Sequence, residues 1–264
     1  MTDAQAEQLA WIHSNRFTVP ELYHRKFMPA QTYRNACHLL KKYNSPEVGF
    51  LHKIQENVFQ RANYFLTAGA IRTLDAQNRI LVRNTRYPVK INPMEKKHDL
   101  SVQAIRIVFE ASEELKGIFW VSDFEMRSGI TPLVKADFLS GALDKEKWRS
   151  HGFNPNPKGR RTPDGYFEAD VEGQRLAFVL EFENHPYSDG MVARMAEYLS
   201  DEYPQAYRLV VSATYKNALR MIQALKSKVR SSEQPKWFVS DFQKATSKPF
   251  KEVWHQIDQP LDKL

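Results

Sequence analysis

Two strand-like runs on either side of a short polar turn constrain the fold of this chain most strongly. The runs cover residues 165–171 and 176–183, and Glu172-Gly173 lies between them. Runs of strand length that flank a tight turn predict a β-hairpin. Asp164 directly precedes the first run, and the second run ends in two glutamates one residue apart. We therefore expect several carboxylates at one end of two adjacent strands.

Apolar segments of strand and helix type alternate around this hairpin. Such alternation indicates an α/β sheet with helices on its faces. The expected helices cover residues 98–115, 191–199 and 217–225, with a charged helical patch within 135–149, and the further strands cover 117–125, 207–213 and 236–239. The sequence thus predicts an α/β domain with a central mixed sheet over residues 98–243, followed by a tail, 244–264, that packs on either domain or presents a partner site.

Length and composition limit the class of protein. A chain of 264 residues is comfortable for two domains, and 42% hydrophobic with 26% charged residues is typical of a globular protein. The single cysteine, Cys37, excludes an internal disulfide and a cysteine-based zinc site. The sequence has no apolar run of membrane-spanning length and no signal-peptide pattern at its start. We expect a cytoplasmic protein with no membrane partner.

The positive charge is concentrated in the first third of the chain. Residues 1–97 contain 15 Lys+Arg and 7 Asp+Glu, a balance of +8, whereas residues 98–264 contain 23 and 24, a balance of −1. Because phosphate neutralisation supplies most non-specific affinity for nucleic acids, this asymmetry indicates a polyanion partner for the N-terminal part. A basic surface with no partner is the alternative.

The order of elements in this basic part suits DNA. Helices are expected at residues 4–15, near 20–27 with Thr18 as the cap, at 31–43, and at 68–74 with Thr67 as the cap. Two strand-like runs at 48–54 and 62–66 resemble a wing. The pattern predicts a winged helix-turn-helix over 1–83, followed by a linker at 84–97, with a helical bundle as the alternative. The side chains expected to contact DNA are Gln31, Arg34, Asn35, His38, Lys41, Lys42, Lys53 and Arg61.

The acids around the hairpin suit a divalent metal ion. Asp164 and Glu181 are expected to bind Mg²⁺ or Mn²⁺ through carboxylate oxygens, as phosphodiester hydrolysis requires. Glu183 shares a strand face with Glu181 and can reach the same ion, and Glu125 joins if its strand lies alongside. A nuclease centre of the restriction-endonuclease type usually has lysine where Glu183 stands. Arg194, on the next helix, is then the candidate that clamps phosphate, because arginine cannot act as a base near neutral pH.

Several landmarks between about residue 17 and residue 239 occur in the order and spacing of a known family. The chain resembles the replication-relaxation family of plasmid and integrative-element proteins, which joins a winged helix to a restriction-nuclease-like domain. The matching landmarks are residues 64–70, His98-Asp99-Leu100, Trp120 with Glu125, Pro163-Asp164, Leu180-Glu181-Phe182-Glu183, Arg194 and Tyr198.

The resemblance implies DNA as the partner, and it leaves two functions open. The family includes relaxases of mobilisable plasmids, which nick DNA with metal-bound acids, and DNA-binding or regulatory proteins. The first expectation is therefore a DNA nicking enzyme of a plasmid or mobile element, and the second is a non-catalytic regulator of transcription or replication. Further expected partners are a second copy of the chain, since helix-turn-helix proteins commonly pair on palindromes, and other relaxosome or replication proteins.

Overall fold

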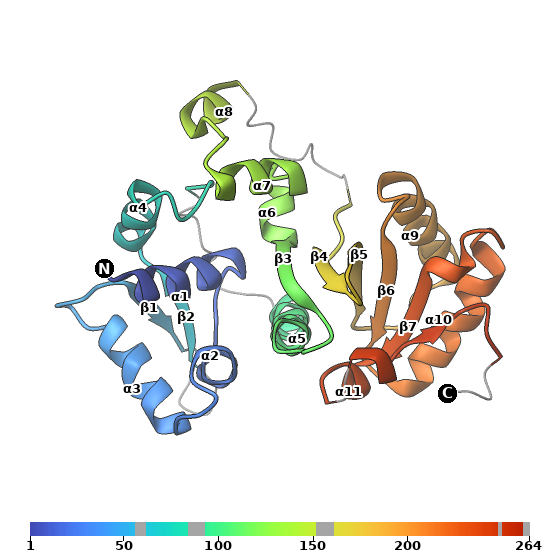
Figure 1. Cartoon of the computed structure of the whole chain (residues 1–264). Coiled ribbons are helices and arrows are strands. Elements are labelled where there is room, and N and C mark those ends of the chain that lie inside the picture. The colour runs from blue at the N-terminus through green and yellow to red at the C-terminus, as the bar shows by residue number, and fades with distance from the viewer. Residues whose placement is uncertain (56–61, 84–92, 152–160, 248–249, 261–264) are drawn as a thin grey trace. The chain divides into compact units, whose positions relative to one another are not determined.

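The protein is a mixed α/β chain that divides into two compact units, as a computed structural model of the whole chain shows (Figure 1). The structure describes residues 1–55, 62–83, 93–151, 161–247 and 250–260. The first unit combines residues 1–96 with 124–157, and the second combines residues 97–123 with 158–264.

Helices make up most of the first unit. Its elements are α1 (Asp3–Ser14), α2 (Pro20–Phe27), α3 (Tyr33–Tyr43), β1 (Leu51–Ile54), β2 (Asn63–Leu66), α4 (Ala68–Ala76), most of α6 (Asp123–Arg127), α7 (Pro132–Ser140) and α8 (Lys145–His151). The strands β1 and β2 pair antiparallel, with Leu51 opposite Leu66. The helices and strands expected between residues 4 and 74 are thus present, although α3 begins at Tyr33 rather than at residue 31 and β1 begins at Leu51 rather than at residue 48.

Side-chain hydrogen bonds explain how α1, α2 and α3 are held together. Gln8 on α1 accepts a hydrogen bond from the Tyr23 hydroxyl at 2.7 Å and from the Tyr43 hydroxyl at 2.9 Å. Thr67 caps α4, as expected, by accepting from the backbone N–H of Ala70. The expected Thr18 cap of α2 is wrong, because the backbone of Thr18 pairs with Tyr64 and α2 begins after Val19.

A six-stranded mixed sheet forms the centre of the second unit. Its strands lie in the order β3 (Lys116–Ser122), β4 (Gly165–Val171), β5 (Gln174–Glu183), β6 (Tyr207–Ser212), β7 (Trp237–Asp241) and β8 (His255–Gln256). The pairs β3/β4, β4/β5 and β7/β8 are antiparallel, whereas β5, β6 and β7 are parallel. The helices are α5 (Pro93–Glu110), α9 (Asp189–Glu202), α10 (Tyr215–Lys228) and α11 (Phe242–Ala245), with short 3₁₀ turns at Gln234–Lys236 and Phe250–Glu252.

The predicted hairpin is confirmed as β4 and β5. Glu172 and Gly173 both have positive φ, at 52° and 83°, as a two-residue type I′ turn requires. Three aromatic rings face one another across β3, β4 and β5. Trp120 stacks on Phe167 at 5.2 Å between ring centroids, and Phe167 stacks on Phe178 at 4.8 Å. These cross-strand contacts fix the register of the strands next to Asp164.

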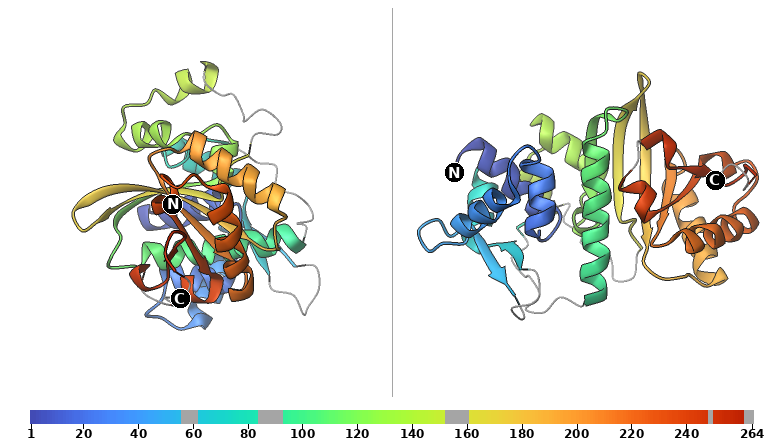
Figure 2. Two further views of the ribbon diagram at one scale, coloured as in Figure 1. Left: turned by 90° about the vertical axis from the view of Figure 1, so that its right-hand side faces the viewer. Right: turned by 90° about the horizontal axis from the view of Figure 1, so that it is seen from below.

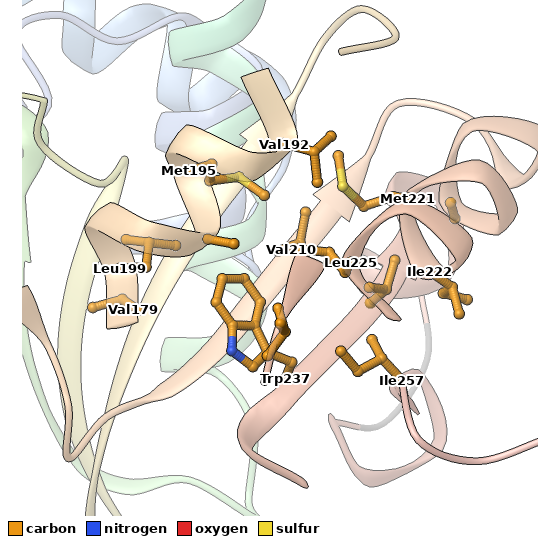
Figure 3. Packing of buried hydrophobic residues seen from close by; sticks show 14 of the residues in the cluster. Val179, Val192, Met195, Leu199, Val210, Met221, Ile222, Leu225, Trp237 and Ile257 are labelled. Atoms are coloured by element: carbon orange, nitrogen blue, oxygen red, sulfur yellow. The ribbon is translucent and has the colours of Figure 1, made fainter. Parts of the chain in front are cut away.

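Helices cover both faces of the sheet (Figure 2). Side chains of α9 and α10 pack on one face, around the fully buried Trp237 (Figure 3). On the other face, α5 and α11 pack on the aromatic rings of β3 to β5. Along β5, Val179 belongs to the first layer and Leu180 to the second. Odd-numbered residues of β5, including Glu181 and Glu183, therefore point toward the side of α9 and α10.

The boundaries of the two units differ from the expected ones. Residues 124–157 belong to the first unit, and the expected linker ends earlier, because α5 begins at Pro93. Buried Asp75 on α4 explains the first difference, since it pairs with Lys145 at 3.0 Å and Arg149 at 2.5 Å, both on α8. The rest of the linker, 84–92, lies outside the described residues.

Two further expectations concern the end of β3 and the C-terminal tail. The strand expected over 117–125 ends at Ser122, and α6 follows it. The described part of the C-terminal tail packs on the second unit, where β8 extends the sheet beside β7. Phe250 and Trp254 contact the ring of Phe109 at 5.3 and 6.0 Å, so these apolar side chains fix the tail in place.

Candidate functional site

Asp164 and Glu181 come together across β4 and β5. Gly165 pairs with Leu180, so that Asp164, one residue before β4, lies opposite Glu181. The backbone N–H of Phe182 donates to Asp164 Oδ2 at 2.7 Å, which fixes the carboxylate against β5. The expected pairing of these two acids from adjacent strands is present in the structure.

Glu181 is a buried carboxylate with unused hydrogen-bonding capacity. Glu181 is 4% exposed, and within the described part of the chain its Oε1 atom has no hydrogen-bond partner. Burial raises the pKa of Glu181, and the charge of Asp164 raises it further, against the opposing effects of Arg161 and His98. A divalent cation bound by Oε1 would offset both effects, because it would coordinate the unpaired oxygen and supply a compensating charge.

His98 on α5 holds Asp164 from the other side. Its Nε2 atom lies 3.1 Å from Asp164 Oδ2 and its Nδ1 atom 3.6 Å from Asp99 Oδ1. Its ring contacts the Phe182 ring, with 5.7 Å between centroids. Burial by itself would lower the pKa of His98, but the two carboxylates raise it to about 10. His98 is therefore an imidazolium at neutral pH and balances the charge of Asp164.

Arg161 lies beside Glu181 and remains partly open to solvent. Its guanidinium is 3.7 Å from Glu181 Oε2, and the Arg161 side chain is 32% exposed. The same guanidinium lies over the Tyr187 ring, 5.8 Å from the centroid. A partly exposed arginine next to two acids can pair with a phosphate oxygen that approaches them.

Glu183 has a different role from Glu181, although both point toward the same side. The Ser212 hydroxyl donates to Glu183 Oε2 at 2.8 Å, and the backbone N–H of Tyr187 donates to Oε1 at 2.6 Å. Glu183 thus anchors the loop between β5 and α9. The structure does not bring its carboxylate to Asp164, because both oxygens are turned to the loop and to β6.

The remaining two residues of the expected centre lie elsewhere. Glu125 is on helix α6 in the first unit, not on a strand, and it pairs with Lys135 Nζ at 2.6 and 2.7 Å. That ion pair gives Glu125 a local partner. Arg194 is exposed on α9, where its guanidinium lies over Gly190. The cations in contact with the acid pair are Arg161 and His98.

The residues expected to contact DNA form an exposed surface on α3 and beside it. The α3 side chains point to solvent, and Arg34 Nε donates to His38 Nε2 at 3.3 Å. Gln31 precedes α3, which begins after the capping residue Thr32, and Lys53 is exposed on β1. Arg61 lies outside the described residues. The α3 side chains expected to contact DNA are all exposed: Arg34, Asn35, His38, Lys41 and Lys42.

Sequence reasoning missed His98 and Arg161 as members of the site. Arg161 comes three residues before Asp164, which is the one signal that could have indicated it. His98 is 66 positions from Asp164, and only the packing of α5 on the sheet brings the two together. In the described ranges, no group of three His, Cys, Asp or Glu side chains is arranged to hold a metal ion.

Asp164 and Glu181 fit a divalent cation chemically, because both offer carboxylate oxygens and one of these is buried without a partner. Glu183 is not placed with this pair, since its two oxygens accept from Ser212 and from the Tyr187 N–H. None of the described helices has the length and apolar character that crossing a membrane needs. A comparison of the chain with family models, curated proteins and solved structures finds no match.

Proposed function

We propose that this protein binds DNA and cleaves a phosphodiester bond with a divalent metal ion held by Asp164 and Glu181. One observation carries the proposal: Glu181 is buried beside Asp164, and one of its oxygens has no hydrogen-bond partner in the described chain. A carboxylate in that setting is costly unless a cation completes it. The class of protein is then a metal-dependent DNA nicking endonuclease, in accord with the resemblance to the replication-relaxation family.

The side chains around the pair have separate tasks in this proposal. His98 and the N–H of Phe182 hold Asp164 in one orientation. Arg161 pairs with the phosphate and takes the place that the resemblance assigns to a basic side chain. A divalent ion, when bound, activates water and offsets charge on the phosphate.

The first unit supplies the DNA contact. In the proposal, α2 and α3 form a helix-turn-helix, with β1 and β2 as the wing. The exposed polar and basic side chains of α3 support this assignment, because they are the types that contact phosphates and base edges. The excess of positive charge in residues 1–97 supports it as well.

A second function is favoured by one specific observation. Asp164 Oδ2 already accepts a hydrogen bond from Phe182 and lies 3.1 Å from His98, and Glu183 is fully engaged. Two of the three expected acids thus have partners from the protein itself. This arrangement suits a non-catalytic DNA-binding regulator that retains the nuclease-like sheet.

Nicking of supercoiled plasmid DNA separates the two functions. With Mg²⁺ or Mn²⁺, we expect the wild type to convert supercoiled DNA that contains its binding site to the open circular form. Asp164→Asn and Glu181→Gln should reduce this conversion to the level without protein. Wild type that leaves such DNA intact would favour the regulator. Variants as active as the wild type would exclude Asp164 and Glu181 as the site of cleavage.

A further inference from the structure

Helix α10 has one exposed face that is strongly basic. Its 14 residues, Tyr215–Lys228, contain no aspartate or glutamate. Its apolar side packs into the core, so the opposite side faces solvent. The four cations of the helix are all exposed: Lys216, Arg220, Lys226 and Lys228. The second unit as a whole carries no such excess, since residues 97–123 with 158–264 contain 19 Lys+Arg and 20 Asp+Glu, a balance of −1.

Hydrogen-bond donors follow this face in a single stripe. Lys216, Arg220, Gln223 and Ser227 are spaced by four, three and four residues, which places them on one side of a helix. The Ser227 hydroxyl donates to the backbone oxygen of Ala224 at 2.8 Å, so the other three residues supply the donors of the stripe. Arg220, Gln223 and Ser227 line a hollow of about 380 Å³ beside α10. Lysine, arginine, amide and hydroxyl groups are the side chains that contact phosphate and sugar oxygens.

The hollow leads toward the acid pair. Tyr187 lines it, and the Tyr187 ring also lies under the Arg161 guanidinium, which is 3.7 Å from Glu181. Glu183 lines the hollow too, but its oxygens are occupied by Ser212 and the Tyr187 N–H. Asp189 is on the opposite wall, at the start of α9. A polyanion would therefore contact the wall formed by α10.

We infer that the stripe on α10 binds the phosphate backbone of a nucleic-acid strand and leads that strand past Tyr187 and Arg161 to Asp164 and Glu181. The inference rests on the proposed function for the identity of the strand as DNA. The exposed cations and the donor stripe of α10 are complementary to a polyanion, and contacts of this kind do not depend on base sequence.

The salt dependence of DNA binding by the full chain tests this surface. We would titrate a labelled duplex and a labelled single strand with wild type, Arg220→Gln and Lys116→Gln by fluorescence anisotropy at several salt concentrations. Lys116 is an exposed cation on β3 outside the stripe, so its variant is the matched control for loss of one charge. Thermal unfolding of each variant checks that the fold is retained.

Removing a phosphate contact should lower the slope of log K against log salt by about one. We expect that change for Arg220→Gln on at least one of the two DNAs and no change for Lys116→Gln. Equal slopes for wild type and Arg220→Gln would overturn the inference, as would a chain that binds neither DNA. If Arg220→Gln lowers the slope but the wild type cuts no DNA, the proposed cleavage fails and the surface on α10 stands.

Discussion

At the scale of single residues, the two glutamates at the end of β5 differ in their surroundings. Both point toward the side of α9 and α10. Glu183 accepts two hydrogen bonds, from Ser212 and Tyr187, whereas Glu181 keeps a buried oxygen without one among the described residues. Identical side chains on one strand face thus have different chemistry, because the neighbouring strand and loop supply donors to one of them.

Gly165 directly follows Asp164 and packs against the Trp120 ring. A Cβ atom there would lie 2.4 Å from the Trp120 ring, which is far inside van der Waals contact. Gly165→Ala should therefore destabilise the protein by about 1–3 kcal/mol, the usual cost of overpacking a core. Urea-induced unfolding measures the loss.

Gly190→Ala is the matched control for this substitution. Gly190 lies in the first turn of α9, and its nearest neighbour would be the mobile end of Arg194, at 3.7 Å. We expect Gly190→Ala to be neutral or slightly stabilising, because alanine is the better helix former. If Gly165→Ala is as stable as the wild type, the Trp120 ring does not prevent a side chain at residue 165.

At the scale of elements, α8 is bound to α4 by a buried charge cluster. Asp75 accepts hydrogen bonds from Arg149, Lys145 and Arg83, and Lys145 also donates to the backbone oxygen of Asp75 at 2.6 Å and to Asn78 at 2.7 Å. Burial alone would raise the pKa of Asp75, but the three cations lower it to about 2.

This cluster predicts a defined dependence of stability on pH. Because the folded pKa of Asp75, about 2, is below its ordinary value of 3.8, the ionised carboxylate favours the folded state. The contribution, about 2 kcal/mol by linkage, is fully present above pH 4 and is lost as the pH falls through 2. Guanidinium-induced unfolding between pH 2 and pH 7 measures it.

Asp75→Asn should remove this dependence and cost about 3–5 kcal/mol at pH 7, because three cations lose their buried partner. Asp3→Asn is the control, since Asp3 pairs with Arg79 at the surface and such pairs contribute little. If Asp75→Asn keeps the stability of the wild type, α8 is held by contacts other than this cluster.

Helix α3 is the element on which the proposed DNA contact depends. Arg34→Ala and Lys41→Ala each remove one exposed cation, so each should weaken DNA binding and lower its salt slope by about one. Gel-shift titrations at several salt concentrations test both variants. Binding that is unchanged in both would exclude α3 as the recognition helix.

Most elements were predictable because their patterns are local. The β4–β5 hairpin has a turn dipeptide and apolar runs, and α4 has its capping threonine. The strand expected as far as Glu125 was wrong, because the apolar run 118–121 followed by Phe124 does not show where β3 ends and α6 begins. Periodicity cannot distinguish these two states over so few residues.

At the scale of the whole molecule, the chain order does not match the division into units. Residues 124–157 interrupt the second unit and belong to the first, which the alternation of strands and helices could not indicate. The candidate site likewise combines residues that the order of elements along the chain does not bring together. Asp164 and Glu181 were predictable from adjacent strands, but His98 comes from α5 and required the packed structure.

Binding of Mn²⁺ by the full chain, measured by isothermal titration calorimetry, tests the central claim most directly. Wild type should bind the ion, Glu181→Gln should bind it more than about 100-fold more weakly because a ligand is lost, and Glu183→Gln should bind it as the wild type does. Wild type that binds no Mn²⁺, or equal affinity of wild type and Glu181→Gln, would contradict a metal site at Asp164 and Glu181.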